Sequence, residues 1–416
     1  MTENPSTAAT GTETSTRRTR VVVVGGGYAG TMAANRLTQR DDVDVALINP
    51  RPDFVERIRL HQLVGGTHDA VHDFSDVLSP RVGLVIGEAA RIDAARRAVE
   101  LESGGTVEYD YLVYAVGSAG AEPTVPGAAE FAYPLSTLEG ALRARSAVEA
   151  AGHAAGGPPA VTVAGAGPTG IETAAELAEQ GCRVTLLCGG VLGPYLHPRA
   201  RRALAARLEE LGVRVLDGPG SRAAEVGAAV VRLEDGREVR GGVTLWTAGF
   251  GVPDLAARSR LSTDPAGRLL TDETLTSVDD PRIVAAGDST SPSGIPYRMS
   301  CQAAIPLGSL AADAVLARIE GRSPRAVSPG FVGQCLSVGR RDGLVQASTS
   351  DDHAKKGFVR GRTAAAIKEA VCWSTYRGLV FEGRRPGLVN WAFLKDGRRR
   401  DLLETRVALA REGSAL

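Results

Sequence analysis

The sequence of 416 residues is poor in lysine and cysteine and has no net charge. Its five cysteines form no C-x-x-C pair and have no metal-ligand spacing with the six histidines, so the sequence predicts neither a metal site nor a disulphide scaffold. Scattered cysteines are typical of a reducing cytoplasm. The 48 basic residues balance 48 acidic ones, which excludes the positive surplus that nucleic-acid binding requires.

Long apolar runs are also missing. No stretch of about 18 consecutive apolar residues occurs, and no transmembrane helix is therefore predicted. Residues 1–19 are rich in Thr, Ser and Glu and lack the apolar segment of a signal peptide, so we expect a disordered N-terminal tail. The composition, 43% hydrophobic and 23% charged, is that of a soluble globular protein long enough for two or three domains.

Glycine is abundant, and six glycines stand in two copies of one motif. In each copy a short apolar run, 21–24 or 161–164, leads into G-x-G-x-x-G, and a helical pattern follows. The first glycine of such a motif permits a tight turn, the second lets the backbone approach a pyrophosphate, and the third lets the helix pack on the strand. The helix N-terminus then favours the anionic pyrophosphate. The sequence therefore predicts two dinucleotide sites, at Gly25, Gly27 and Gly30 and at Gly165, Gly167 and Gly170.

The segments after the two motifs repeat one plan, which indicates an internal duplication of an α/β unit. Each unit continues with a helix, a strand, a hairpin and a buried strand that ends in small residues. These span 29–37, 43–49, 101–107 and 111–118 in the first unit, and 169–180, 183–188, 233–239 and 243–250 in the second. A linker rich in Gly, Ala and Pro is expected at 150–159. Beyond the units we expect a strand at 283–286, a helix at 301–319, strands at 331–338 and 343–347, and a helix at 363–377.

Polar residues at the strand ends indicate how each dinucleotide is held. A ribose-binding acid is expected about 20 residues after the first motif, where the strand ends at Asn49, whose amide oxygen can accept one such bond. We expect Arg51 beside the adenine end, with a solvated surface charge as the alternative. The corresponding position of the second unit is Cys188, so the motif does not select between NADH and NADPH. Asp288 follows a later strand, where a carboxylate can accept a bond from a ribityl hydroxyl.

The order of these parts resembles the flavoproteins with two dinucleotide-binding domains, the pyridine nucleotide-disulfide oxidoreductase superfamily. The matching parts span residues 20 to about 320, and the strand ending at Ala115 and Gly117 stands in place of the family's A-T-G. The resemblance implies that the first motif binds FAD and the second NAD(P)H. With the neighbouring loops, it places the flavin contacts at Gly25, Gly27, Tyr28, Ala29, Gly30, Asn49, Arg51, Arg57, Ala115, Gly117, Gly287, Asp288 and Gln302, and the nicotinamide contacts at Gly165, Gly167 and Gly170.

Within that superfamily the chain is most similar to the type II NADH:quinone oxidoreductases and the apoptosis-inducing-factor-like reductases. The C-x-x-x-x-C pair of the disulphide members is absent, since residues 54–63 contain no cysteine, and a redox disulphide is disfavoured. Cys301 and Cys335 form the one pair that could resemble the reactive cysteines of sulphide:quinone reductases; buried inert thiols are the favoured interpretation. Gln302 matches the first glutamine of the quinone reductases' A-Q-x-A-x-Q, whereas Pro306 replaces the second.

Three residues are the candidates for a catalytic role: Gln302, Glu172 and His61. Glu172 lies one turn into the second motif's helix and matches a family glutamate near the nicotinamide; the alternative is a solvated helix glutamate. His61 lies where the disulphide members place their cysteines, so it is expected near the isoalloxazine; a histidine packed for structure is the alternative. For Gln302 the alternative is an ordinary helix start.

These observations predict an α/β fold with two doubly wound, Rossmann-like dinucleotide-binding domains, one inserted in the other, plus a small C-terminal α/β region. The expected domains are a tail at 1–19, a discontinuous FAD domain at 20–155 and 272–325, an NAD(P) domain at 156–271 and a C-terminal cap at 326–416. The first hypothesis is an FAD-dependent NAD(P)H dehydrogenase that passes electrons to a quinone-like acceptor. The alternatives are a flavin oxidase or dehydrogenase of a small metabolite, with a degenerate nicotinamide site, and a flavin-bearing redox-sensing interaction protein.

The expected partners follow from these hypotheses. A small quinone-like acceptor is predicted, and nucleic acid is not. The resemblance implies an interface or a peripheral membrane contact through the C-terminal region, and a homodimer is compatible with it. For the helix at 363–377, packing on its own domain is the favoured interpretation, because an amphipathic surface helix needs a cleaner apolar face. The predicted location is the cytoplasm, with the inner face of the membrane as the alternative.

Overall fold

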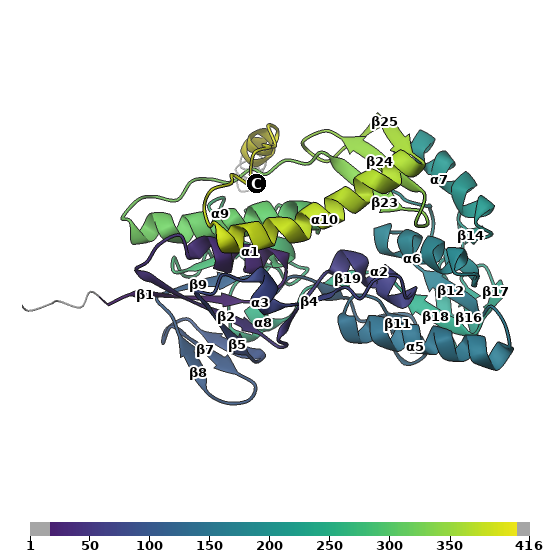
Figure 1. Cartoon of the computed structure of the whole chain (residues 1–416), viewed down its shortest axis with the longest axis horizontal. Helices are drawn as coiled ribbons and strands as arrows, with labels where there is room; N and C mark the ends of the chain where they lie inside the picture. The colour runs from purple at the N-terminus through teal and green to yellow at the C-terminus, as the bar shows by residue number, and fades with distance from the viewer. Residues whose placement is uncertain (1–16, 406–416) are drawn as a thin grey trace, which may run out of the picture.

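The computed structural model describes residues 17–405, which form an elongated molecule (Figure 1). The predicted tail lies outside the described residues up to residue 16, whereas Thr19 already begins strand β1 (Thr19–Val24). Two five-stranded sheets and a three-stranded C-terminal sheet dominate the described part, with helices packed on them. This arrangement confirms the predicted α/β class.

The first sheet carries the first glycine motif. Its strands are all parallel, in the order β21 (Ile283–Ala285), β9 (Tyr111–Tyr114), β1, β2 (Val43–Asn49) and β5 (Val82–Ile86). The last four residues of β1 are buried, as expected for a strand inside a parallel sheet that is covered on both faces. Helix α1 (Tyr28–Leu37) follows β1 and packs on α9 (Cys301–Ile319). One late strand, β21, thus completes a sheet of early residues.

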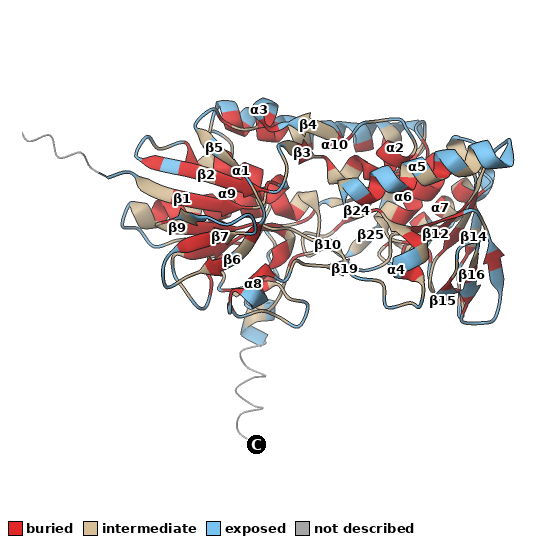
Figure 2. Ribbon diagram, turned by 90° about the horizontal axis from the view of Figure 1, so that it is seen from below, coloured by how far each residue is buried: buried red, intermediate tan, exposed pale blue. Residues whose placement is uncertain are grey.

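The second sheet repeats this topology around the second motif. Its parallel order is β11 (Ala132–Pro134), β18 (Val243–Trp246), β12 (Ala160–Ala164), β13 (Arg183–Leu187) and β14 (Arg214–Leu216). Helix α6 (Pro168–Glu179) follows β12, and α5 (Leu138–Ala155) contributes buried alanines to the same core while exposing its other side (Figure 2). Strand β11 and helix α5 therefore pack with this unit. We therefore propose that β11 and α5 join the second unit, ahead of the expected boundary at residue 155, because they share its sheet and its core.

Shorter elements fill the connections. The expected turns at 101–107 and 233–239 join β7 (Ala98–Leu101) to β8 (Thr106–Glu108) and β16 (Val230–Leu233) to β17 (Glu238–Arg240), with β6 (Ala89–Asp93) and β15 (Ala223–Val226) completing the two small sheets. The remaining elements include β3 (Asp53–Val55), β4 (Val71–Asp73), α3 (Phe74–Val77), β10 (Ala119–Gly120), α4 (Ala128–Phe131), α7 (Pro198–Glu210), β19 (Phe250–Gly251), α8 (Leu255–Arg258), β20 (Leu269–Thr271) and β22 (Thr290–Pro292).

The C-terminal region spans the two units. Strands β23 (Gly333–Ser337), β24 (Gly343–Ser348) and β25 (Ala354–Arg360) form an antiparallel sheet, and helix α10 (Arg362–Arg384) runs from it across α1 (Figure 1). The helix continues beyond the expected end at residue 377 because its last turns are packed: Leu379 is fully buried, and its carbonyl accepts a hydrogen bond from Asn35 Nδ2 at 3.0 Å.

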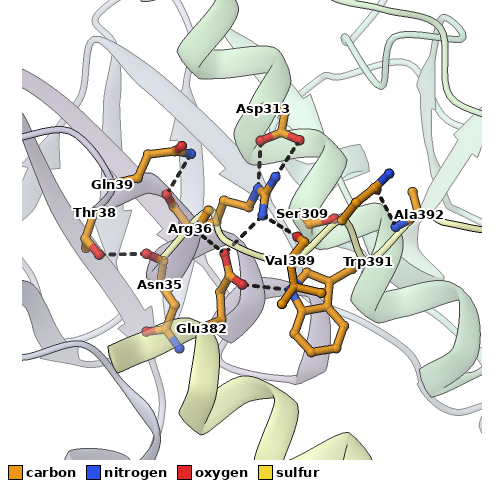
Figure 3. A network of polar contacts seen from close by, with 12 residues as sticks. Asn35, Arg36, Thr38, Gln39, Ser309, Asp313, Glu382, Val389, Trp391 and Ala392 are labelled. Atoms are coloured by element: carbon orange, nitrogen blue, oxygen red, sulfur yellow. Dashed lines mark hydrogen bonds and ion pairs between the residues drawn. The ribbon is translucent and has the colours of Figure 1, made fainter. Parts of the chain in front are cut away.

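A polar network fixes α10 to helices α1 and α9 (Figure 3). Arg36 of α1 donates to Asp313 of α9 at 2.7 Å and to Glu382 of α10 at 3.2 Å, and also to the Val389 carbonyl at 2.9 Å. Glu382 is fully buried and accepts a further bond from Trp391 Nε1 at 2.7 Å. Because one guanidinium compensates carboxylates on two helices, the three helices are held in one arrangement.

Candidate functional site

The first glycine loop has the shape that its sequence predicts. Gly25 has φ +102°, and a Cβ there would lie 2.4 Å from the Ala115 carbonyl oxygen. A Cβ on Gly30 would lie 1.8 Å from the Gly25 carbonyl oxygen, so only glycine fits this strand–helix contact. Around Gly27, the N-cap of α1, nothing lies within 4 Å of an added Cβ. The loop is therefore closed on the protein side and open at the helix N-terminus, as a pyrophosphate cradle must be.

The second loop reproduces this geometry. Gly165 has φ +120°, and a Cβ on Gly170 would lie 1.9 Å from the Gly165 carbonyl oxygen. Space is again open around Gly167, the residue before α6, and Pro168 occupies the first helical position. Proline is suited there because the first N–H groups of a helix have no intrahelical partner. Both loops thus present a free helix N-terminus to an anion.

Asn49 holds the first loop in place. Its Oδ1 accepts a hydrogen bond from the Gly26 N–H at 3.0 Å, and its Nδ2 donates to the Arg51 carbonyl at 2.8 Å. The amide oxygen expected to bind a ribose therefore already has a backbone partner, although a carbonyl oxygen has a second lone pair. Arg51 pairs through Nη2 with Glu139 of α5 at 2.6 Å, so the structure places its head group against the second unit.

A polar chain joins three loops beside the first site. Arg57 Nη1 donates to Ser118 Oγ at 3.1 Å, and Ser118 Oγ donates to Asp288 Oδ2 at 2.7 Å. Burial lowers the pKa of Arg57, and the Asp288 carboxylate opposes that shift. Gly287 has φ +75° and lies close to Ala29, where an added Cβ would approach the Ala29 Cβ to 2.9 Å. The structure thus brings the expected contacts Arg57, Gly287 and Asp288 together with the start of α1.

The buried polar atoms near these loops that have no hydrogen-bond partner among the described residues include the Tyr28 hydroxyl and Gln302 Oε1. Tyr28 begins α1, and Gln302 lies in the first turn of α9, whose N-cap Ser300 accepts a bond from the Ala303 N–H at 3.3 Å. Leaving a buried polar atom unpaired typically costs about 1–3 kcal/mol, so such atoms indicate a polar ligand. Together with the open space at Gly27 and Gly117, this donor and acceptor set fits a dinucleotide with a polar ring system.

Glu172 and His61 meet in a buried cluster. Glu172 Oε1 pairs with Lys368 Nζ at 3.0 Å and accepts a bond from the Ser337 N–H at 2.9 Å, while its Oε2 lies 3.8 Å from His61 Nδ1. Glu172 is 5% exposed and His61 2%, so neither is a solvated surface residue. Helix α2 (Leu60–Val64) supplies His61, α6 supplies Glu172 and α10 supplies Lys368. With Ser337 of β23, four segments far apart in sequence therefore meet at one carboxylate.

Burial lowers the pKa of His61 to about 4, although Glu172 opposes this shift; Lys368, Arg340 and Arg59 reinforce it. His61 is therefore neutral at pH 7, and its Nε2 has no partner in the described part of the chain. Because the unfolded chain takes up the proton first, stability falls as the pH drops from about 6.5 to 4, by about 3 kcal/mol from this group.

This acid sensitivity can be measured with urea unfolding between pH 7 and pH 4. We expect the wild-type chain to lose about 3 kcal/mol more over this range than His61→Gln, which cannot take up the proton. Carboxylates in other parts of the protein titrate equally in both chains, so their contributions cancel when the two unfolding free energies are subtracted. Parallel pH curves for the two chains would contradict the expected protonation.

Of the five cysteines, Cys372 is buried and the other four are partly buried. All five are free in the structure, and burial raises the pKa of Cys301 and Cys335 and raises that of Cys372 to about 11. A thiol with a raised pKa is a poor nucleophile at neutral pH. The interpretation of Cys301 and Cys335 as inert thiols therefore has physical support.

Sequence reasoning missed Ser118, Ser337 and Lys368 as site residues. Ser118 ends the expected strand at 111–118, which is part of the family resemblance. Lys368 carried a weaker signal, as one of four lysines in an arginine-rich chain and the only one inside an expected helix. Nothing local in the sequence linked either serine to its carboxylate. Among residues 17–405, no helix has the length and hydropathy needed to span a membrane.

Comparison with known proteins finds a matching family and several relatives. A family model described as pyridine nucleotide-disulphide oxidoreductase matches residues 19–308. An NADH dehydrogenase-like protein of Mycobacterium tuberculosis is 32% identical over 319 residues, which cover 70% of this chain and 78% of that protein. A type II NADH:quinone oxidoreductase of the same organism is 29% identical over 357 residues, which cover 75% of each chain.

Solved structures share the architecture. NDH2 from Plasmodium falciparum, in complex with NADH, aligns with a TM-score of 0.74 at 16% identity and covers 91% of this chain and 100% of its own. The sulfide:quinone oxidoreductase of Aquifex aeolicus aligns with a TM-score of 0.72 at 19% identity, covering 87% of this chain and 92% of its own. At these identities the likeness shows the fold.

Proposed function

The chain belongs to the pyridine nucleotide-disulphide oxidoreductase family, and on that premise we propose that it is an FAD-dependent NAD(P)H dehydrogenase with a quinone-like electron acceptor. It is an oxidoreductase. The observation that carries the proposal is the pair of matched glycine loops, each closed by a steric contact at its third glycine and open at its second. Two dinucleotide sites in one chain suit electron transfer between two cofactors.

We assign the FAD to the first loop. Gly25, Gly27 and Gly30 would hold its pyrophosphate against α1, and Asp288, supported by Ser118 and Arg57, would accept a hydroxyl of the ribityl chain. When bound, the flavin supplies the two-electron chemistry, and the protein supplies binding, orientation and electrostatics. The N-terminus of α9, with Gln302 and the Ser300 cap, provides a positive helix end that favours negative charge nearby.

We assign the NAD(P)H to the second loop, at Gly165, Gly167 and Gly170. Glu172, which follows one turn later on α6, is held by Lys368 and lies beside a neutral His61. We propose that this cluster shapes the region between the two dinucleotides and excludes water from it, since Glu172 and His61 are almost fully buried. The second strand end carries Cys188, so preference between NADH and NADPH stays open.

The acceptor and the cellular location are further parts of the proposal. The relatives named NADH:quinone oxidoreductases support a quinone-like acceptor. Contact of the C-terminal region with a membrane or a partner, and a homodimer, remain predictions; the outward side of α10 exposes Trp373, which is 60% exposed. The division into FAD, NAD(P) and C-terminal domains is proposed with β11 and α5 assigned to the second unit.

The test is anaerobic mixing of the flavin-loaded protein with NADH and, separately, with NADPH. We expect one of them to bleach the visible band of the oxidised flavin, and a short-chain quinone added afterwards to restore it. A flavin band that neither nucleotide bleaches would overturn the dehydrogenase assignment. If oxygen but none of a panel of quinones reoxidises the reduced flavin, the proposal of a quinone-like acceptor is overturned. The dehydrogenase assignment then stands.

A further inference from the structure

A basic cavity lies on the outer side of the buried Glu172 cluster. It has a volume of about 240 Å³ and opens between α2, the β23–β24 turn and the first turns of α10. Its lining consists of Gln62, Ser337, Arg340, Arg341, Arg362, Ala365, Ala366, Lys368 and Glu369. Neither glycine loop contributes to this lining within residues 17–405, so the cavity is separate from both proposed dinucleotide cradles.

The charges of the lining are unbalanced. Four cations face it, Arg340, Arg341, Arg362 and Lys368, against one carboxylate, Glu369. That carboxylate is already held by the buried Arg59, with contacts of 2.6 and 3.2 Å to its two oxygens. The side chains of Arg341 and Arg362 form no hydrogen bond or ion pair with any residue of the described range.

Two deeper residues add donors at the inner wall. Gln62 is 1% exposed; its Oε1 accepts a bond from Arg59 Nη1 at 3.0 Å, and its Nε2 has no partner among the residues that the structure describes. Lys368 is 9% exposed and reaches Glu172 with Nζ while lining the cavity. The N–H groups of the Gln62 amide are therefore free to donate to a ligand in the cavity.

We propose that this cavity is a binding site for a small oxyanion, a molecule with a phosphate or carboxylate group. Arginine side chains present planar forks of N–H donors that match both groups, and Gln62 and Lys368 add donors at the inner end. The volume suits a small anion and is below that of a typical drug-sized ligand site. The site is separate from the two glycine loops, because neither loop lines it in the described part of the chain.

Lys368 connects the anion site to the buried Glu172 cluster. Its ammonium group is shared between the anion site and Glu172, to which Nζ lies at 3.0 Å. Glu172 uses one of the three ammonium N–H donors, so a bound oxyanion accepts from the others and shares the positive charge of Lys368 with Glu172. Anion binding at the surface is therefore coupled to the cluster that we place between the two dinucleotides.

The proposal is tested by isothermal titration of the full chain with inorganic phosphate, with sulfate and with citrate, at constant ionic strength set by sodium chloride. We expect saturable binding of at least one oxyanion at one site per chain. Arg341→Gln combined with Arg362→Gln should weaken it by tenfold or more, because two charge-assisted donors are removed. Tighter binding of citrate identifies a carboxylate ligand, and tighter binding of phosphate identifies a phosphate ligand.

The matched control removes the same charge nearby. Lys355→Gln combined with Lys356→Gln alters two exposed lysines of β25 that do not line the cavity, and we expect unchanged affinity. Equal weakening in both double variants, or no saturable binding to any of the three anions, would overturn the site. Because the titration needs no turnover, its result is separate from the outcome of the flavin-reduction test. Thermal unfolding of each variant verifies that it is folded.

Discussion

Gly30→Val is expected to give a chain that binds no flavin. A Cβ at this position would lie 1.8 Å from the Gly25 carbonyl oxygen and 3.0 Å from the Gly25 carbonyl carbon, and the branched valine adds two further carbons. These are backbone atoms of the phosphate loop itself, so relief of the clash must displace the loop and the start of α1. A pyrophosphate that depends on the loop's N–H groups then loses its cradle.

The second motif provides a matched variant. In Gly170→Val the added Cβ would lie 1.9 Å from the Gly165 carbonyl oxygen, nearly the same clash in the other unit. We expect Gly170→Val to purify with flavin but to resist reduction by either nicotinamide nucleotide. Gly30→Val should purify colourless and leave the second sheet intact.

Three measurements separate the outcomes: the flavin-to-protein absorbance ratio, the circular dichroism spectrum, and fluorescence quenching by added FAD. Asp288→Asn is the milder companion in case Gly30→Val does not fold. It keeps the side-chain shape and removes the charge that receives the Ser118 hydrogen bond, so FAD affinity should fall about tenfold or more. Full flavin content in Gly30→Val, or loss of flavin in Gly170→Val alone, would reverse our assignment of the two loops.

Glu172→Gln is expected to be the most destabilising single substitution in the buried cluster. Burial by itself lowers the pKa of Lys368, but the Glu172 carboxylate outweighs it, and the net pKa is raised well above the usual value. Removing that carboxylate leaves a buried ammonium without compensation. Loss of one partner of a buried ion pair costs about 3–5 kcal/mol, and we expect a decrease in unfolding free energy of that size at pH 7.

The pH dependence distinguishes this cause from a packing defect. In the wild-type chain the raised pKa of Lys368 gives a contribution that is fully present below the unfolded value of about 10.4 and is lost only above it. In Glu172→Gln, burial acts unopposed and lowers the pKa of Lys368. The unfolded variant then binds the extra proton, so the stability of the variant rises relative to wild type as the pH increases from 7 to 10.

Urea unfolding of both chains at pH 7, 8.5 and 10 gives the required comparison. Glu149→Gln is the control, because Glu149 forms a surface ion pair with Arg145 at 2.9 Å and is 56% exposed. An exposed pair of this kind contributes about 0.3–0.5 kcal/mol, so the control should remain close to wild type at every pH. The proposed pairing would be contradicted if Glu172→Gln lost no more unfolding free energy than Glu149→Gln. It would also be contradicted if the loss in Glu172→Gln did not change with pH.

Much of the fold followed from local rules. The two glycine motifs, the strands beside them and the hairpin turns all lie within a few residues of where the sequence predicts them. These features depend on backbone sterics and on apolar patterning over short windows, which a single sequence displays directly. For the same reason the close strand–helix contacts at Gly30 and Gly170 follow from the sequence alone.

Tertiary packing decided what the sequence left open. The sequence placed β11 and α5 before a Gly-rich linker, yet pairing of β11 with β18 assigns them to the second unit. From the sequence, Glu172 could be either a solvated helix residue or a site residue. Its burial against Lys368 and His61 excludes the solvated state. Helix α10 extends beyond its expected end because distant groups, such as Asn35, form hydrogen bonds with the backbone of its last turns.

The sequence by itself thus determined the fold class, the order of the two glycine-motif units and the shape of the two glycine loops, since each is encoded by residues that are neighbours along the chain. The tertiary structure alone decided which side chains surround Glu172 and which cations line the cavity outside it. Those groups come from helices and turns up to 307 positions apart (His61 to Lys368), and long-range packing, which no local pattern specifies, sets their distances.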